Sequence, residues 1–380
     1  LSKYDQIASR FKKEHQEGTT YLKGGIETNN TQFNHMIEQL EQVSIRSQEP
    51  ILITGPTGAG KSQLAQRVYD LRKLRGKLTG KLVTVNCATL KGENAMSALF
   101  GHKKGAYTGA SSDRAGLLKE ANEGLLFLDE IGELGIDEQA MLLKAIEDKR
   151  FMPFGSDKEV SSNFQLIAGS NRDLWLQTQK GLFREDLLAR IDLWTYELPS
   201  LKGRLEDLEP NIDFELEKFS NKSGYLVRFN TSARDIYLHF STSAEATWSA
   251  NFRDLNASIT RMGTLSDGGR ITTEVAHDEI KRLKQKWHRQ SGNSTPYNKI
   301  QHCIEALLGT SSCDSIDFHE QVLLANVIQV CQKTSSMAEA GRVLFNISRT
   351  TKTSSNDSHR VKQILSKYDI SFGDIKAHSE

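Results

Sequence analysis

Short apolar runs alternate with longer segments of helical spacing up to about residue 201. The apolar runs lie at residues 51–53, 82–85, 125–128 and 164–168. Runs of this length, bounded by turn residues, are typical of strands buried in a parallel sheet. The alternation therefore predicts an α/β fold in which helices flank a parallel sheet on both faces.

The pattern is helical on both sides of this region. Thr31 would cap a helix over residues 33–43, where apolar residues recur at spacings of three and four. From about residue 206 to 289 the strand signals fade and helical periodicity takes over, which predicts a small helical domain. The polar stretch 291–296 predicts a linker, and a third unit, also helical, follows it.

Composition narrows the class of protein. The chain has 380 residues, enough for two or three domains, and its 49 Lys and Arg against 48 Asp and Glu exclude a whole-chain affinity for polyanions. No apolar run approaches the roughly 20 residues that cross a bilayer, and the start of the chain is too polar for a signal peptide. Four scattered cysteines without a CxxC pair indicate reduced, structural thiols. We expect a cytoplasmic protein with no membrane partner.

A glycine-rich segment follows the first apolar run and precedes a helical run. It fits the pattern GxxxxGK[ST] with the residues Gly55, Pro56, Thr57, Gly58, Ala59, Gly60, Lys61 and Ser62. Glycines let backbone N–H groups wrap a phosphate at a helix N-terminus, Lys61 would reach the outer phosphates, and the Ser62 hydroxyl would ligate Mg²⁺. The segment predicts a site for ATP and Mg²⁺.

A pair of acids supports this site. The apolar run 125–128 ends in Asp129 and Glu130, and carboxylates at the end of a buried strand need a partner. Asp129 would bind Mg²⁺, directly or through water, and Glu130 would polarise the attacking water. Nucleotide binding alone does not require Glu130, so its presence indicates an enzyme.

Three further polar residues are candidates for the same chemistry. Asn171 follows the apolar run 164–168 and could orient the water between the two acid-bearing loops. Arg184 and Arg190 lie six residues apart and could reach the nucleotide of a neighbouring subunit, where an arginine stabilises the transferring phosphoryl group. Taken alone, two arginines in a helix are more often solvated salt-bridge partners.

A motif more specific than a P-loop lies between the second and third apolar runs. It closely resembles the GAFTGA loop of the sigma-54-dependent transcriptional activators, the bacterial enhancer-binding proteins, and consists of Gly105, Ala106, Tyr107, Thr108, Gly109 and Ala110. The sequence on both sides of this loop also matches that family, and the resemblance covers roughly residues 34–263. It implies an AAA+ ATPase domain that assembles into a homo-oligomeric ring, usually a hexamer. Loops of the ring would engage sigma-54 RNA polymerase and drive the closed promoter complex to open.

The resemblance also assigns roles by position. Asn86 would restrain Glu130 until the target is engaged. Asn171 would be the first sensor, and Arg253 would be the second, reaching the nucleotide from a helical lid. The two arginines described above would act in trans.

The composition of the loop suits a contact surface, and the chain departs from the family pattern in a few places. Two glycines bracket the lone aromatic Tyr107, so we expect a flexible loop that presents a large apolar surface for contact. Tyr107 replaces the usual Phe, which keeps the ring and adds a hydroxyl. Ser249 and Ala250 stand where the family commonly has Pro-Gly, which bears on the turn before the lid helix, and Ser62 stands where many members carry Glu.

The flanks resemble one subgroup, the regulators of an RNA-repair operon that encodes an RNA ligase and an RNA cyclase. In that subgroup a CARF-type sensory domain, which responds to RNA ends, precedes the ATPase. We expect this chain to lack that domain and residues 1–30 to be the linker from it. On this hypothesis the chain would hydrolyse ATP without an RNA signal.

The C-terminal unit is a candidate DNA reader. Helical patterns cover residues 318–330, 337–345 with Ser335 or Ser336 as the cap, and 356–368. Basic residues dominate from 333 to 367, so promoter-upstream DNA would be held through phosphate contacts by Arg349, Lys352, Arg360 and Lys362. The alternative is an ordinary solvated helical face. The long Ser- and Thr-rich stretch 349–355 leaves the recognition helix unplaced, and the basic run 281–289 favours a solvated helix end over a second DNA contact.

The predicted domains follow from these boundaries. They are the linker 1–30, an AAA+ α/β ATPase domain at 31–204, a helical lid at 205–289, a linker at 290–300 and a helix-turn-helix-like DNA-binding domain at 301–380. Two other functions stay open. One is an AAA+ ATPase that remodels another protein or DNA target, and the other is a DNA-binding regulator whose nucleotide site only gates assembly.

Overall fold

A computed structural model describes residues 3–24, 26, 28–90, 92–107, 110–291, 304, 316–347 and 356–377. The chain divides into two compact units, Leu1–Lys281 and Arg282–Glu380. Several predictions lie outside the described residues: most of the 290–300 linker, Thr108, Gly109, Arg349 and Lys352. Within the described residues, no helix combines the length and the apolar composition needed to cross a lipid bilayer.

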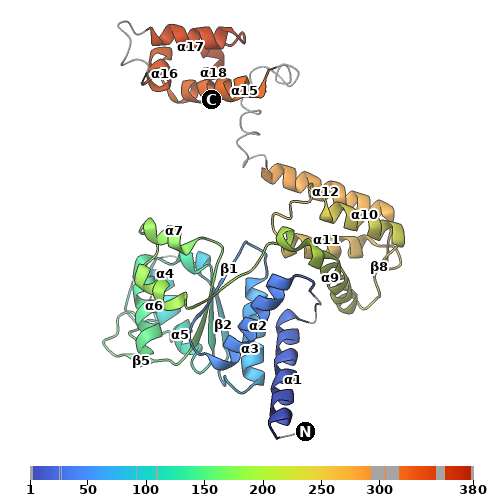
Figure 1. Ribbon diagram of the computed structural model, residues 1–380. Helices are drawn as coiled ribbons and strands as arrows, with labels where there is room; N and C mark the ends of the chain where they lie inside the picture. The colour runs from blue at the N-terminus through green and yellow to red at the C-terminus, as the bar shows by residue number, and fades with distance from the viewer. Residues whose placement is uncertain are drawn as a thin grey trace. The chain divides into compact units, whose positions relative to one another are not determined.

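Among the described residues, a parallel sheet of five strands organises the first unit (Figure 1). The strand order is β2 (Leu82–Asn86), β3 (Leu125–Asp129), β6 (Gln165–Ser170), β1 (Ile51–Thr54) and β7 (Trp194–Glu197). Every pairing is parallel, so the carboxyl ends of the strands meet at one edge of the sheet. This edge is where ligands bind in open α/β folds.

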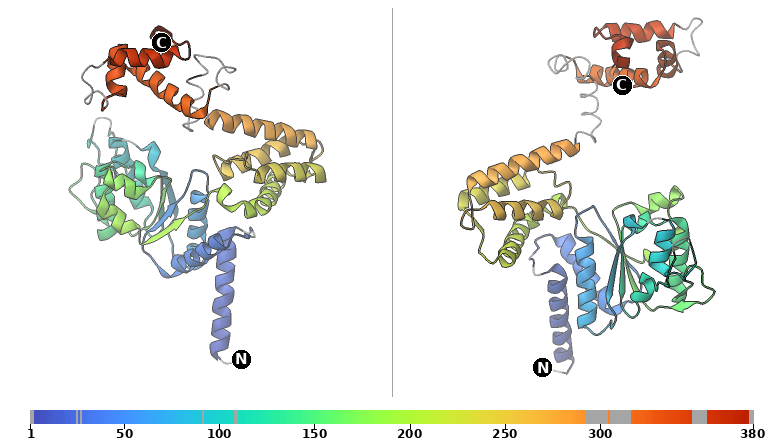
Figure 2. Two further views of the ribbon diagram at one scale, coloured as in Figure 1. Left: turned by 45° about the horizontal axis from the view of Figure 1, so that its top comes forward. Right: turned by 180° about the vertical axis from the view of Figure 1, so that it is seen from behind.

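Helices cover both faces of the sheet, as predicted (Figures 1 and 2). Alternate residues of β3 point to opposite faces: Leu126 and Leu128 join one core cluster, and Leu125 and Phe127 join the other. One face carries α2 (Thr31–Arg46) and α3 (Lys61–Leu74). The opposite face is covered by α4 (Glu93–Phe100), α5 (Leu117–Glu120), α6 (Ile136–Asp148), α7 (Leu174–Gln179) and α8 (Glu185–Ile191).

The four strands expected from apolar runs are confirmed, whereas shorter or mixed strands were missed. β7 alternates its aromatic residues, Trp194 and Tyr196, with the exposed Thr195 and Glu197, so it lacks an apolar run. The antiparallel pair β4 (Arg150–Phe151) and β5 (Val160–Ser161) is only two residues deep. The helix expected over residues 33–43 is present, but it begins at Thr31, and Asn30 instead of Thr31 is its cap, because the Asn30 side chain accepts from the Phe33 N–H.

The N-terminal segment, predicted as a linker, contains the helix α1 (Lys3–Lys23), which packs on α2 and α3. The His15 ring bonds the buried Glu41 carboxylate of α2, and Arg75 Nη2 donates to the Glu14 carbonyl at 2.7 Å. Near its end, Leu22 is 1% exposed. Residues 3–23 therefore belong to the packed unit.

The lid follows β7. It consists of the 3-10 segment η3 (Leu201–Asp207), α9 (Leu208–Ser223), α10 (Thr231–Thr242), α11 (Phe252–Leu265) and α12 (Thr273–Ser291). A short parallel pair, β8 (Arg228–Phe229) with β9 (Arg270–Ile271), was not expected, because two-residue strands give no periodicity. The expected helical character of this region is confirmed.

The second unit is helical. Its described helices are α15 (Phe318–Lys333), α16 (Met337–Leu344), α17 (Asp357–Ser366) and α18 (Phe372–Ala377). They enclose a small core that includes Leu324, Ile328, Val361, Leu365 and Ile375. The expected cap of α16 is confirmed, since the Ser336 hydroxyl accepts from the Glu339 N–H and the Glu339 carboxylate accepts from the Ser335 N–H.

Candidate active site

The glycine-rich segment joins β1 to α3 and needs glycine at its turns. Gly55, Gly58 and Gly60 have φ of 138°, 78° and 103°, a region that side chains disfavour. A Cβ at Gly58 would also collide with the Ala250 carbonyl oxygen. No side chain caps the start of α3, so its first N–H groups remain available to an anion.

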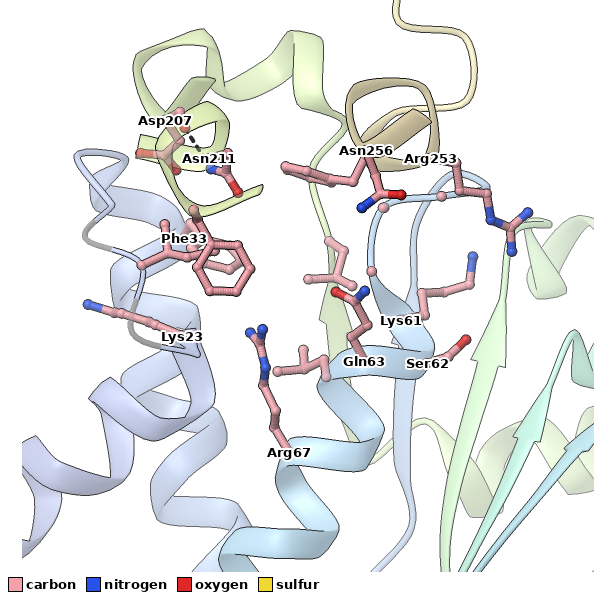
Figure 3. Close-up of a pocket in the computed structure, with 18 of the residues that line it drawn as sticks. Lys23, Phe33, Lys61, Ser62, Gln63, Arg67, Asp207, Asn211, Arg253 and Asn256 are labelled. Atoms are coloured by element: carbon pink, nitrogen blue, oxygen red, sulfur yellow. Dashed lines mark hydrogen bonds between the residues drawn. The ribbon is translucent and has the colours of Figure 1, made fainter. Parts of the chain in front are cut away.

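A cavity of about 370 Å³ opens beside this segment (Figure 3). Its lining combines the phosphate-binding loop, the acids at the end of β3, and residues of the lid. Figure 3 shows Lys61, Ser62 and Arg253 at one end and Phe33 and Asn211 at the other. The cavity therefore has a phosphate end and a distal end.

Lys61 is held at the phosphate end. Its Nζ donates to the carbonyl oxygens of Gly55 at 2.8 Å and Pro56 at 3.3 Å, and lies 4.0 Å from Glu130 Oε1. Burial lowers the pKa of Lys61, while the carboxylates of Glu130 and Asp129 oppose this change. The ammonium group is thus poised next to the position that phosphates would occupy.

Ser62 and Asp129 form the part of the site that fits a divalent cation. The Ser62 hydroxyl donates to Asp129 Oδ2 at 2.9 Å. A hydroxyl and a carboxylate are hard oxygen donors, and Mg²⁺ is usually held by one or two such groups together with waters and substrate phosphates. Among the described residues no cluster of three or more His, Cys, Asp or Glu could hold a metal.

Glu130 and Asn171 lie together at the carboxyl edge of the sheet. Glu130 adopts a left-handed backbone with φ of 56°, directly after the end of β3 at Asp129. The Asn171 N–H donates to Glu130 Oε2 at 3.1 Å, and Asn171 Nδ2 donates to the Thr57 hydroxyl at 3.1 Å. Asn171 therefore connects the acid to the phosphate-binding loop.

The lid is tied to the phosphate-binding loop by residues that the sequence did not single out. Asn251 Nδ2 donates to the Thr57 carbonyl at 2.9 Å, and the Phe252 N–H donates to the Gly58 carbonyl at 3.1 Å. Arg253 lines the cavity, and its charge contributes to the lowered pKa of Lys61. In the turn where the family commonly has Pro-Gly, the Ala250 N–H donates to Asp254 Oδ2 at 3.0 Å.

The structure does not bring Asn86, Arg184 and Arg190 to the cavity; none is among the described residues that line it. Asn86 Oδ1 accepts from the Ala88 N–H at 3.0 Å. Arg184 binds Asp186 through two bonds of 3.0 and 2.6 Å, and Arg190 binds Glu49 at 2.6 Å. In this conformation the two arginines are surface ion-pair partners.

The sequence pattern also did not predict the residues at the distal end of the cavity. The Arg204 guanidinium lies between two rings, 4.2 Å from the centroid of Phe33 and 4.6 Å from that of Phe252. Burial lowers the pKa of Arg204 to about 10. These residues come from α2, η3 and α11, so no local motif could have grouped them.

The aromatic residue of the Gly105–Ala110 motif is not fully exposed, contrary to expectation. The Tyr107 ring packs edge-on against His102, with centroids 5.1 Å apart, and lies 6.4 Å from the Phe154 ring. The Ser97 hydroxyl is 3.4 Å from the Tyr107 hydroxyl. A partly covered ring keeps less apolar surface in water, so the loop has a packed state that a partner would have to displace.

Cys87 is buried behind the acids, and burial raises the pKa of its thiol to about 12, with the charges of Asp129 and Glu130 adding to the shift. A variant that keeps Cys87 and replaces the other cysteines by serine should react with a thiol reagent at pH 8. The reaction should be roughly 1,000-fold slower in the folded than in the unfolded protein, because the thiolate fraction falls by about that factor. Between about pH 9 and 12 the unfolded thiol loses its proton and the folded one keeps it, so stability should fall as pH rises there. Fast labelling of the folded protein would contradict this assignment.

The C-terminal candidates for DNA contact are described in part. Arg360 stacks on the Phe345 ring, 3.6 Å from its centroid, and lies 3.9 Å from Asp357 Oδ1. Lys362, on the same helix, is exposed. Arg360 is thus partly committed to packing within its unit, whereas Lys362 is free to face a phosphate.

Comparisons with known proteins were made on sequence and on structure. A family profile described as the sigma-54 interaction domain matches residues 26–197, and one described as the RtcR C-terminal DNA-binding domain matches residues 294–375. The chain is 52% identical to the transcriptional regulatory protein RtcR of Escherichia coli (strain K12), over 98% of this chain and 68% of that protein. It is 30% identical to the Sigma54-dependent transcriptional activator SfnR of Pseudomonas putida, over 78% of each chain.

The fold has solved counterparts. NtrX from Brucella abortus in complex with ADP aligns with a TM-score of 0.58 and 23% identity, over 91% of this chain and 70% of that one. The same protein in complex with ATP aligns with a TM-score of 0.56 and 22% identity, over 84% and 73%. The expected fold, an α/β ATPase domain with a helical lid and a helical DNA-binding region, is confirmed by these likenesses together with the family matches.

Proposed function

Because this chain belongs to the sigma-54-dependent transcriptional activators, we propose that it hydrolyses ATP with Mg²⁺ to remodel sigma-54 RNA polymerase from the closed to the open promoter complex. We further propose that it works as a ring of identical subunits, a hexamer. The membership accounts for a nucleotide site and a sigma-54 loop in one domain. It favours this function over remodelling of another target, since another remodeller has no need of that loop.

The observation that carries the proposal is the placement of the loop. The Gly105–Ala110 motif lies in the connection between β2 and β3. The carboxyl ends of these strands are paired in register, Asn86 opposite Asp129, directly before Glu130. The connection leaves β2 at Asn86, so a pull on the loop would act on the strand end that is paired with Asp129, and a change at Glu130 would act back on the loop through the same strand end.

The residues of the cavity support a mechanism of positioning and charge stabilisation. Lys61 would exchange its bonds to the carbonyls of Gly55 and Pro56 for bonds to the outer phosphates. Ser62 and Asp129 would hold Mg²⁺, which when bound neutralises charge on the β- and γ-phosphates. Glu130 would polarise the attacking water. The hydrogen bond that the Asn171 N–H donates would hold the Glu130 carboxylate in place.

Hydrolysis on this proposal needs a second subunit. Arg184 and Arg190 do not line the cavity of their own chain. Both are surface residues, and their partners, Asp186 and Glu49, are exposed or half-buried. Each arginine could therefore exchange its ion pair for another contact at little cost. We propose that one or both reach the γ-phosphate of the neighbouring subunit, where they stabilise the transition state. A head-to-tail contact of this kind closes into a ring.

The second unit would direct the protein to its promoter. We propose that it binds DNA upstream of a promoter, and the identity to RtcR favours an RNA-repair operon as the target. Lys362 and, where it can leave Phe345, Arg360 are the described candidates for phosphate contacts; Arg349 and Lys352 remain candidates from the sequence. Such a role places the protein in the cytoplasm with the polymerase.

Replacing Tyr107 tests the proposal. Tyr107→Ala should abolish binding to sigma-54, measured with the nucleotide trapped in a transition-state form, because it removes the one large apolar side chain of the loop. Basal ATP hydrolysis should persist, since Tyr107 does not line the cavity.

Tyr107→Phe is the matched control and should bind sigma-54 nearly as well as the parent, because it keeps the ring. Undiminished binding by Tyr107→Ala would rule out the loop assignment. Active hydrolysis without any sigma-54 binding by the parent chain would instead favour a remodeller of another target.

A further inference from the structure

Asn211 lies in the wall of the distal end of the cavity, away from the phosphate-binding loop (Figure 3). It belongs to the first turn of α9, and the residue is 8% exposed. A nucleotide whose phosphates meet Lys61 and Ser62 would extend its base toward this end. Asn211 is therefore placed to meet the base and not the phosphates.

The orientation of the Asn211 amide is fixed by its neighbour. Asn211 Nδ2 donates to the Asp207 main-chain carbonyl at 2.6 Å. A carbonyl oxygen can only accept, so the amide must present its NH₂ to Asp207 and its oxygen to the other side. Figure 3 shows the bond to Asp207 and the Asn211 oxygen directed away from it, toward the cavity.

Two other polar side chains of the cavity, Asp207 and Asn256, already have partners. The Asp207 carboxylate accepts from the Thr28 hydroxyl at 2.5 Å and from the Asn29 N–H at 2.7 Å. Asn256 Nδ2 donates to the Glu215 carboxylate. Within the described part of the chain, Asn211 Oδ1 has no hydrogen-bond donor. An acceptor that faces the cavity without a protein partner is available to a donor on a ligand.

A donor in the same cavity is also unpaired. Arg204 is 6% exposed, and its Nε is buried without a hydrogen-bond partner in the described residues. The cavity thus offers one open acceptor, with the cationic Arg204 in the same wall but its Nε covered. The edge of adenine carries a donor that matches this acceptor, the exocyclic amino group.

We propose that Asn211 selects the base: its Oδ1 accepts a hydrogen bond from the 6-amino group of adenine and disfavours purines with a carbonyl at that position. This inference rests on the proposed use of ATP. A 6-oxo purine would place an oxygen against Asn211 Oδ1, two acceptors with no proton between them. Asn211 acts in binding the substrate and takes no part in the cleavage of the phosphate.

The test begins with the parent chain and three diphosphates, which avoids hydrolysis. ADP should bind about 10-fold more tightly than purine riboside diphosphate, which lacks only the amino group, and IDP should bind more weakly still. Calorimetric titration of the full chain measures all three. Equal affinity for ADP and purine riboside diphosphate would overturn the role of Asn211 and leave ATP use intact, whereas no binding of any of them would overturn the proposed function itself.

Asn211→Ala then locates the effect. It should lower ADP affinity about 10-fold and bind ADP and purine riboside diphosphate equally, because the acceptor is gone. Asn256→Ala is the matched control. This amide lines the same cavity but already donates a hydrogen bond to Glu215, so the preference for ADP should persist. An unchanged ADP preference in Asn211→Ala would overturn the proposal. This includes the case in which a general loss of stability weakens both ligands alike and keeps their ratio.

Discussion

Replacing Arg184 by alanine is expected to lower ATP turnover about 1,000-fold or more, the effect of removing an arginine that stabilises the transferring phosphoryl group from a neighbouring subunit. The folded chain should tolerate the change. Arg184 is a surface residue, 36% exposed in its side chain, and its one ion pair is with the exposed Asp186. The measurement is steady-state phosphate release at saturating ATP, beside a thermal melt that should not move.

Two comparisons make the Arg184 result specific. Lys180→Ala removes a neighbouring exposed cation and should keep its turnover. Mixing the Arg184→Ala chain with a Glu130→Gln chain should restore activity, because some interfaces then combine an intact Glu130 with an intact Arg184 from the next subunit. In an equal random mixture about a quarter of the interfaces qualify. Failure of the mixture to recover, with each chain folded, would reject a role in trans.

Glu130→Gln is expected to lower turnover by roughly 100- to 10,000-fold while ATP still binds, because the amide cannot polarise water as a carboxylate does. The geometry should survive. The amide oxygen can accept from the Asn171 N–H, as Glu130 Oε2 does at 3.1 Å. Phosphate release measures the loss, and titration with ATP measures the retained affinity.

Glu133→Gln is the control for this change. Glu133 lies in the same short segment and pairs with Arg172, but it does not line the cavity. Its replacement should leave turnover near that of the parent. Unchanged turnover in Glu130→Gln would remove Glu130 from catalysis and leave a nucleotide-gated regulator as the better interpretation.

The phosphate end of the cavity could be predicted because its residues are local in the sequence. Gly55 to Ser62 form one turn, and Asp129 and Glu130 end one apolar strand. The parallel sheet then places them at the same edge without further information. Only the details of their contacts, such as the bond from Ser62 to Asp129, needed the structure.

The distal end could not be predicted in the same way. Its residues come from three distant parts of the chain, which meet only when the lid folds over the sheet: Phe33, then Arg204 with Asn211, and then Phe252. None has an unusual local context. Their grouping follows from tertiary packing, which periodicity does not encode.

Two roles inferred by resemblance depend on states other than the one described. Asn86 would have to exchange its bond to the Ala88 N–H for one to Glu130 in order to restrain it. Tyr107 would have to leave His102 and Phe154 to present its ring. Both remain predictions, and both require a small rearrangement at the carboxyl ends of β2 and β3 or in the loop between them.

The bonds from the start of α11 to the phosphate-binding loop have a consequence for how that loop keeps its shape. Asn251 and Phe252 occupy the Thr57 and Gly58 carbonyl oxygens, which turns these negative ends outward and leaves the N–H groups of the loop to face an anion. The lid thus helps to hold the anion-binding conformation of a loop that lies almost 200 residues upstream in the sequence. A fragment that ended before α11 would retain every letter of the GxxxxGKS signature and still lack part of what makes it a receptor.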